Sequence, residues 1–238
     1  MEEHHISAFI EYANSIAIVA FALSGALTAG HYRLDPFGVM VLAAITAVGG
    51  GTIRDLIMGV EVFWLSRNDY IYSIVITSLI TMLFVRRPSH VPMQLLLVVD
   101  AFGLAMFAVL SAQKALDYQM TGLMAVIMGT ITGVAGGIIR DIICNQIPLL
   151  LRREFYAVVA LFSASLFVIF ESLGFSENFS LFVSMICGLV LRLAAIYWGF
   201  SLPAFAIDDD EDVHNQRGRE EEEEVCVTAD SDEKKESP

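Results

Sequence analysis

Apolar residues dominate seven stretches of the chain, and short segments that contain charged residues or prolines separate them. A helix needs about 20 mostly apolar residues to cross the hydrocarbon layer of a membrane. Prolines such as Pro36, Pro88 and Pro148 lie near the predicted ends. The pattern therefore predicts an all-α polytopic membrane protein with seven spans, at residues 8–29, 37–58, 70–85, 92–114, 121–143, 155–173 and 180–200.

The end of the chain has a different composition. Residues 208–238 carry −10 of the chain's net charge of −13, whereas the chain as a whole is 56% apolar with a mean hydropathy of +0.64. Segments with high charge and few apolar residues cannot bury enough surface to fold alone. The sequence therefore predicts a transmembrane domain over residues 1–207 and a disordered acidic tail over 208–238.

The first six spans contain an internal repeat. The segment Gly49–Asp55, Gly-Gly-Gly-Thr-Ile-Arg-Asp, recurs at 135–141 as Ala-Gly-Gly-Ile-Ile-Arg-Asp, an offset of 86 positions. The same offset matches further residues: Phe21 with Phe107, Thr46 with Thr132, Val48 with Val134, Arg67 with Arg153 and Tyr70 with Tyr156. Spans one to three (about 8–91) and four to six (about 92–175) form the two copies, and span seven lies outside them. Because each copy crosses the membrane an odd number of times, the copies are predicted to be inverted.

Basic residues in the loops predict the orientation. With the N-terminus outside, the inner loops hold five arginines (Arg33, Arg86, Arg87, Arg152 and Arg153) and the outer loops hold only Arg67 and Lys114. An excess of basic residues marks the cytoplasmic side. We therefore expect a multi-pass protein of the cell's inner membrane, with its acidic tail in the cytoplasm.

Glycines interrupt spans two and five at equivalent places. Gly49, Gly50 and Gly51 in span two and Gly136 and Gly137 in span five have low helix propensity, so they are expected to kink or unwind these helices. Backbone carbonyls or hydroxyls near Thr46, Val48, Thr132 and Val134 could then coordinate a cation in a wetted path. The alternative interpretation is close helix packing, for which small residues are common in membranes.

Ionisable residues follow both glycine segments. Arg54, Asp55, Arg140 and Asp141 fall inside predicted spans, where charged residues usually face a cavity or each other. We expect the cross-repeat pairs Arg54 with Asp141 and Arg140 with Asp55; the alternative is that these charges reach the membrane surface. Asp100 in span four either lines the path or hydrogen-bonds nearby backbone, and Asn14 is its counterpart in span one.

Four segments together resemble the bacterial relatives of the trimeric intracellular cation (TRIC) channels: Asp35-Pro36-Phe37-Gly38, Gly49–Asp55, Gly133–Asp141 and Ile147-Pro148 followed by Arg152. The resemblance covers about residues 5–207. It implies seven helices in an inverted three-plus-three repeat with a seventh helix, assembled as a homotrimer. It also implies a pore for monovalent cations in each protomer, lined around the glycine-kinked second and fifth helices. Members of the bacterial group also bear the label of putative glycine transporters.

These residues suit three function classes to different degrees. A K⁺ or Na⁺ channel gains from carbonyls and carboxylates, but two arginines oppose it unless carboxylates neutralise them. A transporter of a small zwitterion such as glycine would use the arginines for the substrate carboxylate. A hydrolase would need Asp55 and Asp141 to share a proton, which the neighbouring arginines disfavour. We therefore expect a channel and no enzyme, with no cofactor or metal beyond the permeating ion. Membrane lipids are the other expected partner, and no nucleic acid is expected.

Overall fold

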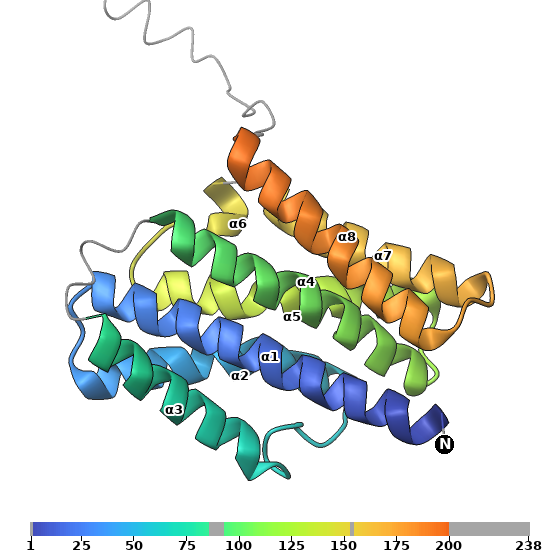
Figure 1. Ribbon diagram of the computed structural model, residues 1–238, viewed down its shortest axis with the longest axis horizontal. Helices are drawn as coiled ribbons and strands as arrows, with labels where there is room; N and C mark the ends of the chain where they lie inside the picture. The colour runs from blue at the N-terminus through green and yellow to red at the C-terminus, as the bar shows by residue number, and fades with distance from the viewer. Residues whose placement is uncertain (1, 86–92, 153–154, 200–238) are drawn as a thin grey trace, which may run out of the picture. The chain divides into compact units, whose positions relative to one another are not determined.

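The computed structural model describes residues 2–85, 93–152 and 155–199, and these residues contain no β-strand. Seven long helices and one short helix follow each other along the chain (Figure 1). Six of them are long and apolar enough to cross a membrane, and α3 is a shorter apolar helix. Their bounds are α1 (Glu2–His31), α2 (Pro36–Met58), α3 (Asn68–Phe84), α4 (Met93–Asp117), α5 (Gly122–Ile143), α6 (Leu149–Arg152), α7 (Phe155–Ser172) and α8 (Glu177–Trp198).

The all-α fold with seven long helices is confirmed, and each predicted span overlaps one of these helices. The four-residue helix α6 was not predicted, because a single helical turn has too few residues for a periodic pattern. The predicted tail at 208–238, the arginines Arg86 and Arg87, and Arg153 lie outside the described residues. The tail therefore stays a prediction.

The turns of the two copies have the same backbone geometry. Arg33 and Gln119, 86 positions apart, both have a positive φ, of 55° and 58°. Gly59 and Asn145, also 86 apart, have φ values of 68° and 53°. The amides that close the first turns are equivalent as well: Leu34 N donates to Ala29 O and Met120 N to Ala115 O, each at 3.0 Å. The duplication therefore extends from the motif to the backbone hydrogen bonds.

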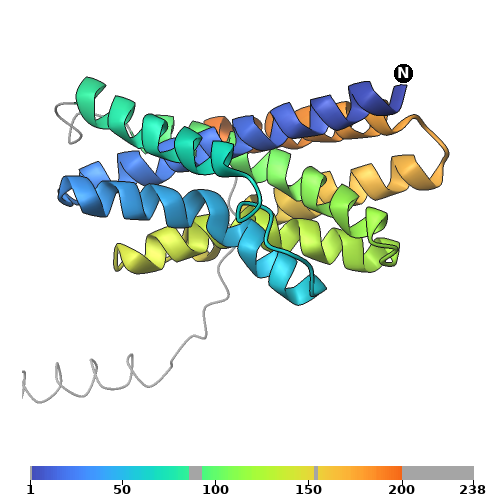
Figure 2. The ribbon, with the colours of Figure 1, turned by 90° about the horizontal axis from the view of Figure 1, so that it is seen from below.

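Equivalent helices run in opposite directions. Figure 1 shows α1 and α4 side by side and antiparallel, and Figure 2 shows α2 and α5 in the same relation. In the first copy, α3 packs on α1 and α2, and in the second copy α7 packs on α4 and α5. The two copies are therefore inverted and interlocked through α1 with α4 and α2 with α5. The last helix, α8, packs on α4 and α7 and has no counterpart on the first copy.

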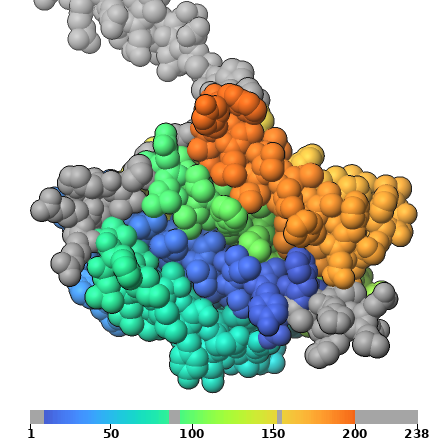
Figure 3. Space-filling view, viewed as in Figure 1, coloured from blue at the N-terminus to red at the C-terminus, as the bar shows by residue number. Residues whose placement is uncertain are grey.

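The bundle has an apolar surface and a partly polar interior. On the face shown in Figure 3, α1 lies between α3 and α4, and α8 crosses α4. Outward-facing side chains of these helices include Phe84, Phe182, Val190 and Tyr197, all exposed. The fully buried side chains, in contrast, include Arg140 and Arg192. This arrangement suits a lipid environment, where charged groups must turn inward.

Close contact between α2 and α5 depends on two glycines. A Cβ atom on Gly50 would lie 2.3 Å from the carbonyl oxygen of Thr132, and one on Gly136 would lie 2.5 Å from that of Thr46. These two contacts are equivalent under the 86-residue offset. Glycine therefore lets the two backbones meet at their crossing, as expected for small residues at membrane helix interfaces.

The glycines do not unwind the helices. Both α2 and α5 stay helical through their glycine segments, so the expectation of unwound backbone there was wrong. The axis of α2 nevertheless turns partway along its length (Figure 2). The hydroxyls of Thr46 and Thr52 bond the carbonyls of Leu42 and Val48, four residues earlier, and such bonds often bend helices. Close packing holds the carbonyls of Thr46 and Thr132 against the partner helix.

Adjacent glycines provide a matched test of this crossing. Gly50→Ala should lower the free energy of unfolding by about 1–3 kcal/mol, because the new methyl group meets a backbone carbonyl. Gly49→Ala should be tolerated, because its Cβ would meet only the flexible end of Ile139, at 3.0 Å. Thermal unfolding in detergent compares the two variants. Equal loss of stability in both would show that the crossing does not require Gly50.

Candidate functional site

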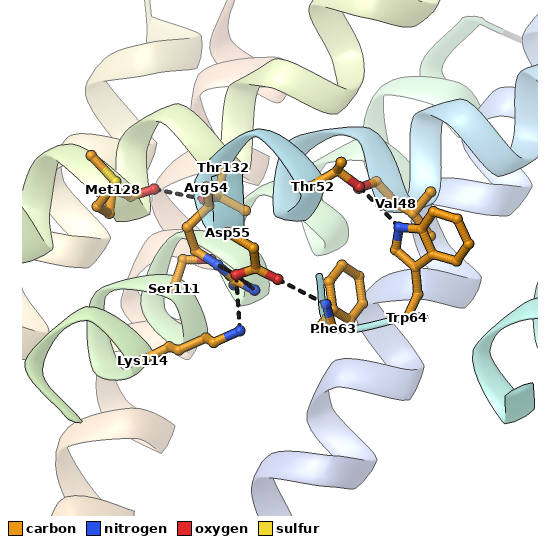
Figure 4. A network of polar contacts seen from close by, with 10 residues as sticks. All are labelled: Val48, Thr52, Arg54, Asp55, Phe63, Trp64, Ser111, Lys114, Met128 and Thr132. Atoms are coloured by element: carbon orange, nitrogen blue, oxygen red, sulfur yellow. Dashed lines mark hydrogen bonds and ion pairs between the residues drawn. The ribbon is translucent and has the colours of Figure 1, made fainter. Parts of the chain in front are cut away.

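The first charged cluster surrounds Asp55 near the end of α2 (Figure 4). Arg54 donates to its Oδ1 through Nε at 2.8 Å, and its Nη2 lies 2.8 Å from the same oxygen. Lys114 of α4 lies 2.8 Å from this oxygen as well. The Asp55 side chain is completely buried. One carboxylate therefore serves two cations in the protein interior.

The loop after α2 is fixed to this cluster. The backbone N–H of Phe63 donates to Oδ2 of Asp55 at 2.9 Å, and the Phe63 ring lies 5.6 Å from the guanidinium carbon of Arg54. Trp64 in the same loop donates from its indole N–H to Thr52 at 2.9 Å. A Cβ on Gly51 would lie 2.5 Å from the Phe63 ring. Asp55 and Gly51 therefore hold the loop against the helix that precedes it.

The second cluster repeats this arrangement around Asp141. Arg140 donates through Nε to Oδ1 of Asp141 at 2.9 Å, and the Leu149 N–H donates to Oδ2 at 2.9 Å. Leu149 is the counterpart of Phe63. The second cluster also contains Asp100, whose Oδ1 lies 2.5 Å from Nη1 of Arg140. Here one guanidinium serves two carboxylates, the reverse of the first cluster.

The predicted cross-repeat ion pairs are wrong. Each arginine pairs with the aspartate next to it, because its long side chain folds back along the helix. The remaining guanidinium nitrogen does reach the other copy, where it meets a serine. Nη1 of Arg54 donates to Ser111 of α4 at 2.8 Å, and Nη1 of Arg140 donates to Ser24 of α1.

The burial of the two arginines shows whether they face the protein interior or reach the membrane surface. Arg54 is 4% exposed and Arg140 is not exposed at all. Neither guanidinium therefore extends to the membrane surface, and both lie inside the protein. Each arginine follows its contact glycine, Gly50 or Gly136, by four residues, which places it on the same helix face one turn later.

The threonines and valines predicted to coordinate a cation do not form an open site. The hydroxyls of Thr46 and Thr132 donate to carbonyls of their own helices, at 2.6 and 2.7 Å. Both side chains are buried, as is Val134, whereas Val48 is partly buried in an apolar cluster. Gly137 packs against the hydroxyl of Tyr156, where a Cβ would lie at 2.5 Å. The glycine crossing is therefore a packed contact between helices.

Several residues of the clusters were missed by sequence reasoning. Lys114 was counted as a loop charge, yet it lies on α4 and its side chain is 23% exposed. The sequence did not distinguish Ser24 and Ser111 as partners of the arginines, because serine is common in membrane helices. Arg192 of α8 is buried, with its guanidinium carbon 4.8 Å from the centre of the Tyr156 ring. The one available sequence signal for Arg192 was its charge within the predicted last span, where charged residues usually face the protein interior.

A cavity of about 320 Å³ opens beside the first cluster. Arg54 and Lys114 form its basic side, and Asp117, also in its lining, is acidic. Its other lining residues are Ile10, Asn14, Phe63, Tyr70, Leu110 and Gln113. The cavity therefore brings charges of both signs next to the buried carboxylate of Asp55.

Metal binding and acid catalysis find little support in this geometry. Among the described residues, no group of three histidine, cysteine or acidic side chains is placed to hold a metal ion. Asp55 and Asp141 belong to separate clusters, and each accepts hydrogen bonds from its own arginine and its own loop. The two carboxylates therefore do not form the proton-sharing pair that a hydrolase would need.

Loss of Asp55 should destabilise the protein strongly. In Asp55→Asn, Arg54 and Lys114 keep their charges without a carboxylate, and breaking a buried ion pair in this way costs about 3–5 kcal/mol. Asp69→Asn is the control, because Asp69 pairs with Arg67 at the surface, where such pairs contribute about 0–1 kcal/mol. Unfolding in detergent measures both. Removing the charge of Arg54 as well, in Arg54→Gln/Asp55→Asn, should restore part of the lost stability. A double variant no more stable than Asp55→Asn would contradict the coupling between Arg54 and Asp55.

Sequence comparisons find the same duplication. The family model described as Glycine transporter matches residues 11–86 and again 97–172, which are 86 positions apart. A UPF0126 membrane protein of Vibrio cholerae is 47% identical over 188 residues, 79% of each chain. The UPF0126 inner membrane protein YadS of Escherichia coli is 41% identical over 196 residues, 82% of this chain and 95% of that one.

Solved structures agree with the fold. The TRIC channel orthologue from Rhodobacter sphaeroides is 34% identical, with a TM-score of 0.76 over 81% of this chain and 99% of its own. A structure that explains conductance through TRIC cation channels is 39% identical, with a TM-score of 0.74 over 83% of this chain and 98% of its own. With its duplicated motif and inverted copies, the chain belongs to the TRIC family of membrane proteins, whose sequence model carries the description glycine transporter.

Proposed function

We propose that the protein is a monovalent cation channel that conducts K⁺, with a path in each protomer beside the crossing of α2 and α5. The observation that carries this proposal is the neutralisation of both intramembrane arginines. Arg54 pairs with Asp55, and Arg140 pairs with Asp141 and Asp100. Unpaired arginines would repel a permeating cation. The paired carboxylates neutralise this positive charge, so the arginines no longer argue against a cation channel.

The likeness to solved channels supports the same proposal. The matched structures are described as TRIC cation channels, and almost their whole length aligns with this chain. The cavity beside Asp55 opens next to the first cluster, with Asp117 in its lining. K⁺ or Na⁺ would be the permeating ion, and homotrimeric assembly within the lipid bilayer is proposed from the trimeric relative.

Transport of a small zwitterion such as glycine is the second candidate. One observation favours it: the cavity contains the cationic Arg54 and Lys114 as well as the anionic Asp117, so it could meet both charges of an amino acid. Against it, Arg54 already binds Asp55 and Ser111, and Lys114 already binds Asp55. A substrate carboxylate would have to compete with these buried contacts.

Reconstitution distinguishes the two functions. The purified chain in a planar bilayer with symmetric KCl should give unitary K⁺ currents without any amino acid, because a channel needs no substrate gradient. Parallel liposomes should show no saturable uptake of labelled glycine. Empty bilayers and liposomes are the controls. Saturable glycine uptake without unitary currents would favour the transporter.

The proposed orientation places the N-terminus outside and the C-terminus in the cytoplasm of the inner membrane. Cys226 in the acidic tail serves as a reporter once Cys144 and Cys187 are changed to serine. A thiol reagent that cannot cross membranes should leave intact cells unlabelled at Cys226 and label it after permeabilisation. Labelling of Cys226 in intact cells at the same rate as in permeabilised cells would show the opposite orientation.

A further inference from the structure

A groove of about 390 Å³ lies where α1 ends, α2 begins and α3 ends, and these three helix ends lie together at one end of the bundle (Figure 1). Four of its lining residues are buried, each no more than 6% exposed: Ala26, Leu27, Val39 and Thr81. The groove shares no lining residue with either charged cluster. It is therefore a separate feature from the cavity beside Asp55.

The exposed edge of this groove carries a positive charge. Arg33, in the turn between α1 and α2, lines the groove and is exposed. Leu34 beside it also lines the groove and is 40% exposed. Among the lining residues that the structure describes, Arg33 is the one with a charged side chain. The groove therefore combines an apolar interior with a single cation at its edge.

The second copy has larger side chains at two equivalent places. Counting 86 positions forward, Gly30 of the groove corresponds to Leu116, and Thr81 corresponds to Phe167. Phe167 is 1% exposed, and it belongs to one apolar cluster with Leu116 and with Leu181 of α8. The helix α8 packs on α4 and α7, which are the counterparts of α1 and α3. The second copy therefore fills with protein side chains a space that the first copy leaves open.

The surroundings of the groove favour a lipid as its occupant. Nearby side chains on the outside of α2 and α3 are apolar and exposed: Phe37 by 69%, Leu83 by 70% and Phe84 by 84%. In a bilayer such side chains contact hydrocarbon, so acyl chains lie next to the groove. A basic residue at the end of membrane helices is suited to the phosphate of a lipid headgroup. A chain in the groove would place its phosphate near Arg33.

We propose that the groove binds one acyl chain of an anionic phospholipid, and that Arg33 pairs with the phosphate of this lipid. In the proposed orientation, this end of the bundle lies in the cytoplasmic leaflet, whose surface carries anionic lipids. The bound chain contacts α1, α2 and α3, so the lipid stabilises the packing of the first copy, as α8 does for the second. The site binds lipid and not the permeating ion, so it is independent of the channel proposal.

Native mass spectrometry of the full chain in detergent tests the headgroup preference. The first palmitoyl-oleoyl phosphatidylglycerol should bind about fivefold more tightly than phosphatidylcholine with the same chains, because one basic residue contributes about this factor. Arg33→Gln should remove the preference, and glutamine suits this turn because Gln119 has the same positive φ at the equivalent position. Arg67→Gln is the control. Its side chain is 43% exposed, and it precedes α3 at the end away from the groove, so the preference should remain.

A variant that fills the groove tests the position of the acyl chain. Thr81→Phe introduces the side chain that the second copy has at Phe167. It should weaken phosphatidylglycerol binding at least about tenfold, because displacing two methylene groups already costs about this factor. Ile80→Phe is the matched control, because Ile80 is 50% exposed on the outside of α3 and should leave binding unchanged. Glycerol 3-phosphate, which has the phosphate without a chain, should not compete with the lipid.

A second measurement locates the lipid even if Thr81→Phe does not fold. Phosphatidylglycerol with a diazirine in its acyl chain should crosslink to the parent chain at or beside Met82, which lines the groove, and Arg33→Gln should reduce this product. Equal binding of the two lipids, unchanged binding in a folded Thr81→Phe, crosslinks away from the groove, or competition by glycerol 3-phosphate would overturn the proposal. Absent K⁺ currents with lipid binding intact would overturn only the proposed function.

Discussion

The contact between the backbones of α2 and α5 is the constraint on which the rest of the structure depends. Gly50 meets the carbonyl of Thr132 and Gly136 meets that of Thr46, at distances that a methyl group could not tolerate. One turn beyond each contact, on the same helix face, an arginine enters the other copy. The crossing thus sets the depth at which Arg54 and Arg140 bind Ser111 and Ser24.

Charge neutralisation follows from this placement. An arginine inside a membrane protein is costly unless carboxylates and hydroxyls surround it. Each arginine here obtains a carboxylate from the next residue, and the same aspartate also binds the loop that follows its helix. The Arg-Asp motif therefore has two structural tasks, which are to neutralise a buried cation and to anchor the chain after the helix.

The two copies share a backbone but differ in charge and cover. Lys114 adds a cation to the first cluster, whereas Asp100 adds an anion to the second. The last helix, α8, packs mainly on α4 and α7 of the second copy and places Arg192 over Tyr156. A duplicated fold therefore contains two clusters with the same Arg-Asp pair, one with an additional cation and one with an additional anion.

The sequence by itself determined the membrane class, the seven long helices, the 86-residue duplication and its inversion, because apolar length and the parity of crossings are properties of the linear chain. It also singled out Arg54, Asp55, Arg140, Asp141 and Asp100 as ionisable residues within the predicted spans, because charges are rare inside apolar spans. Only the tertiary structure decided which groups pair. An arginine side chain is long enough to reach either the next residue in the chain or a residue on the facing helix. Sequence spacing therefore could not decide whether Arg54 pairs with Asp55 or with Asp141. Likewise, unwinding and close packing both favour glycine, and only the tertiary structure showed that the helices stay wound while Gly50 meets the Thr132 carbonyl.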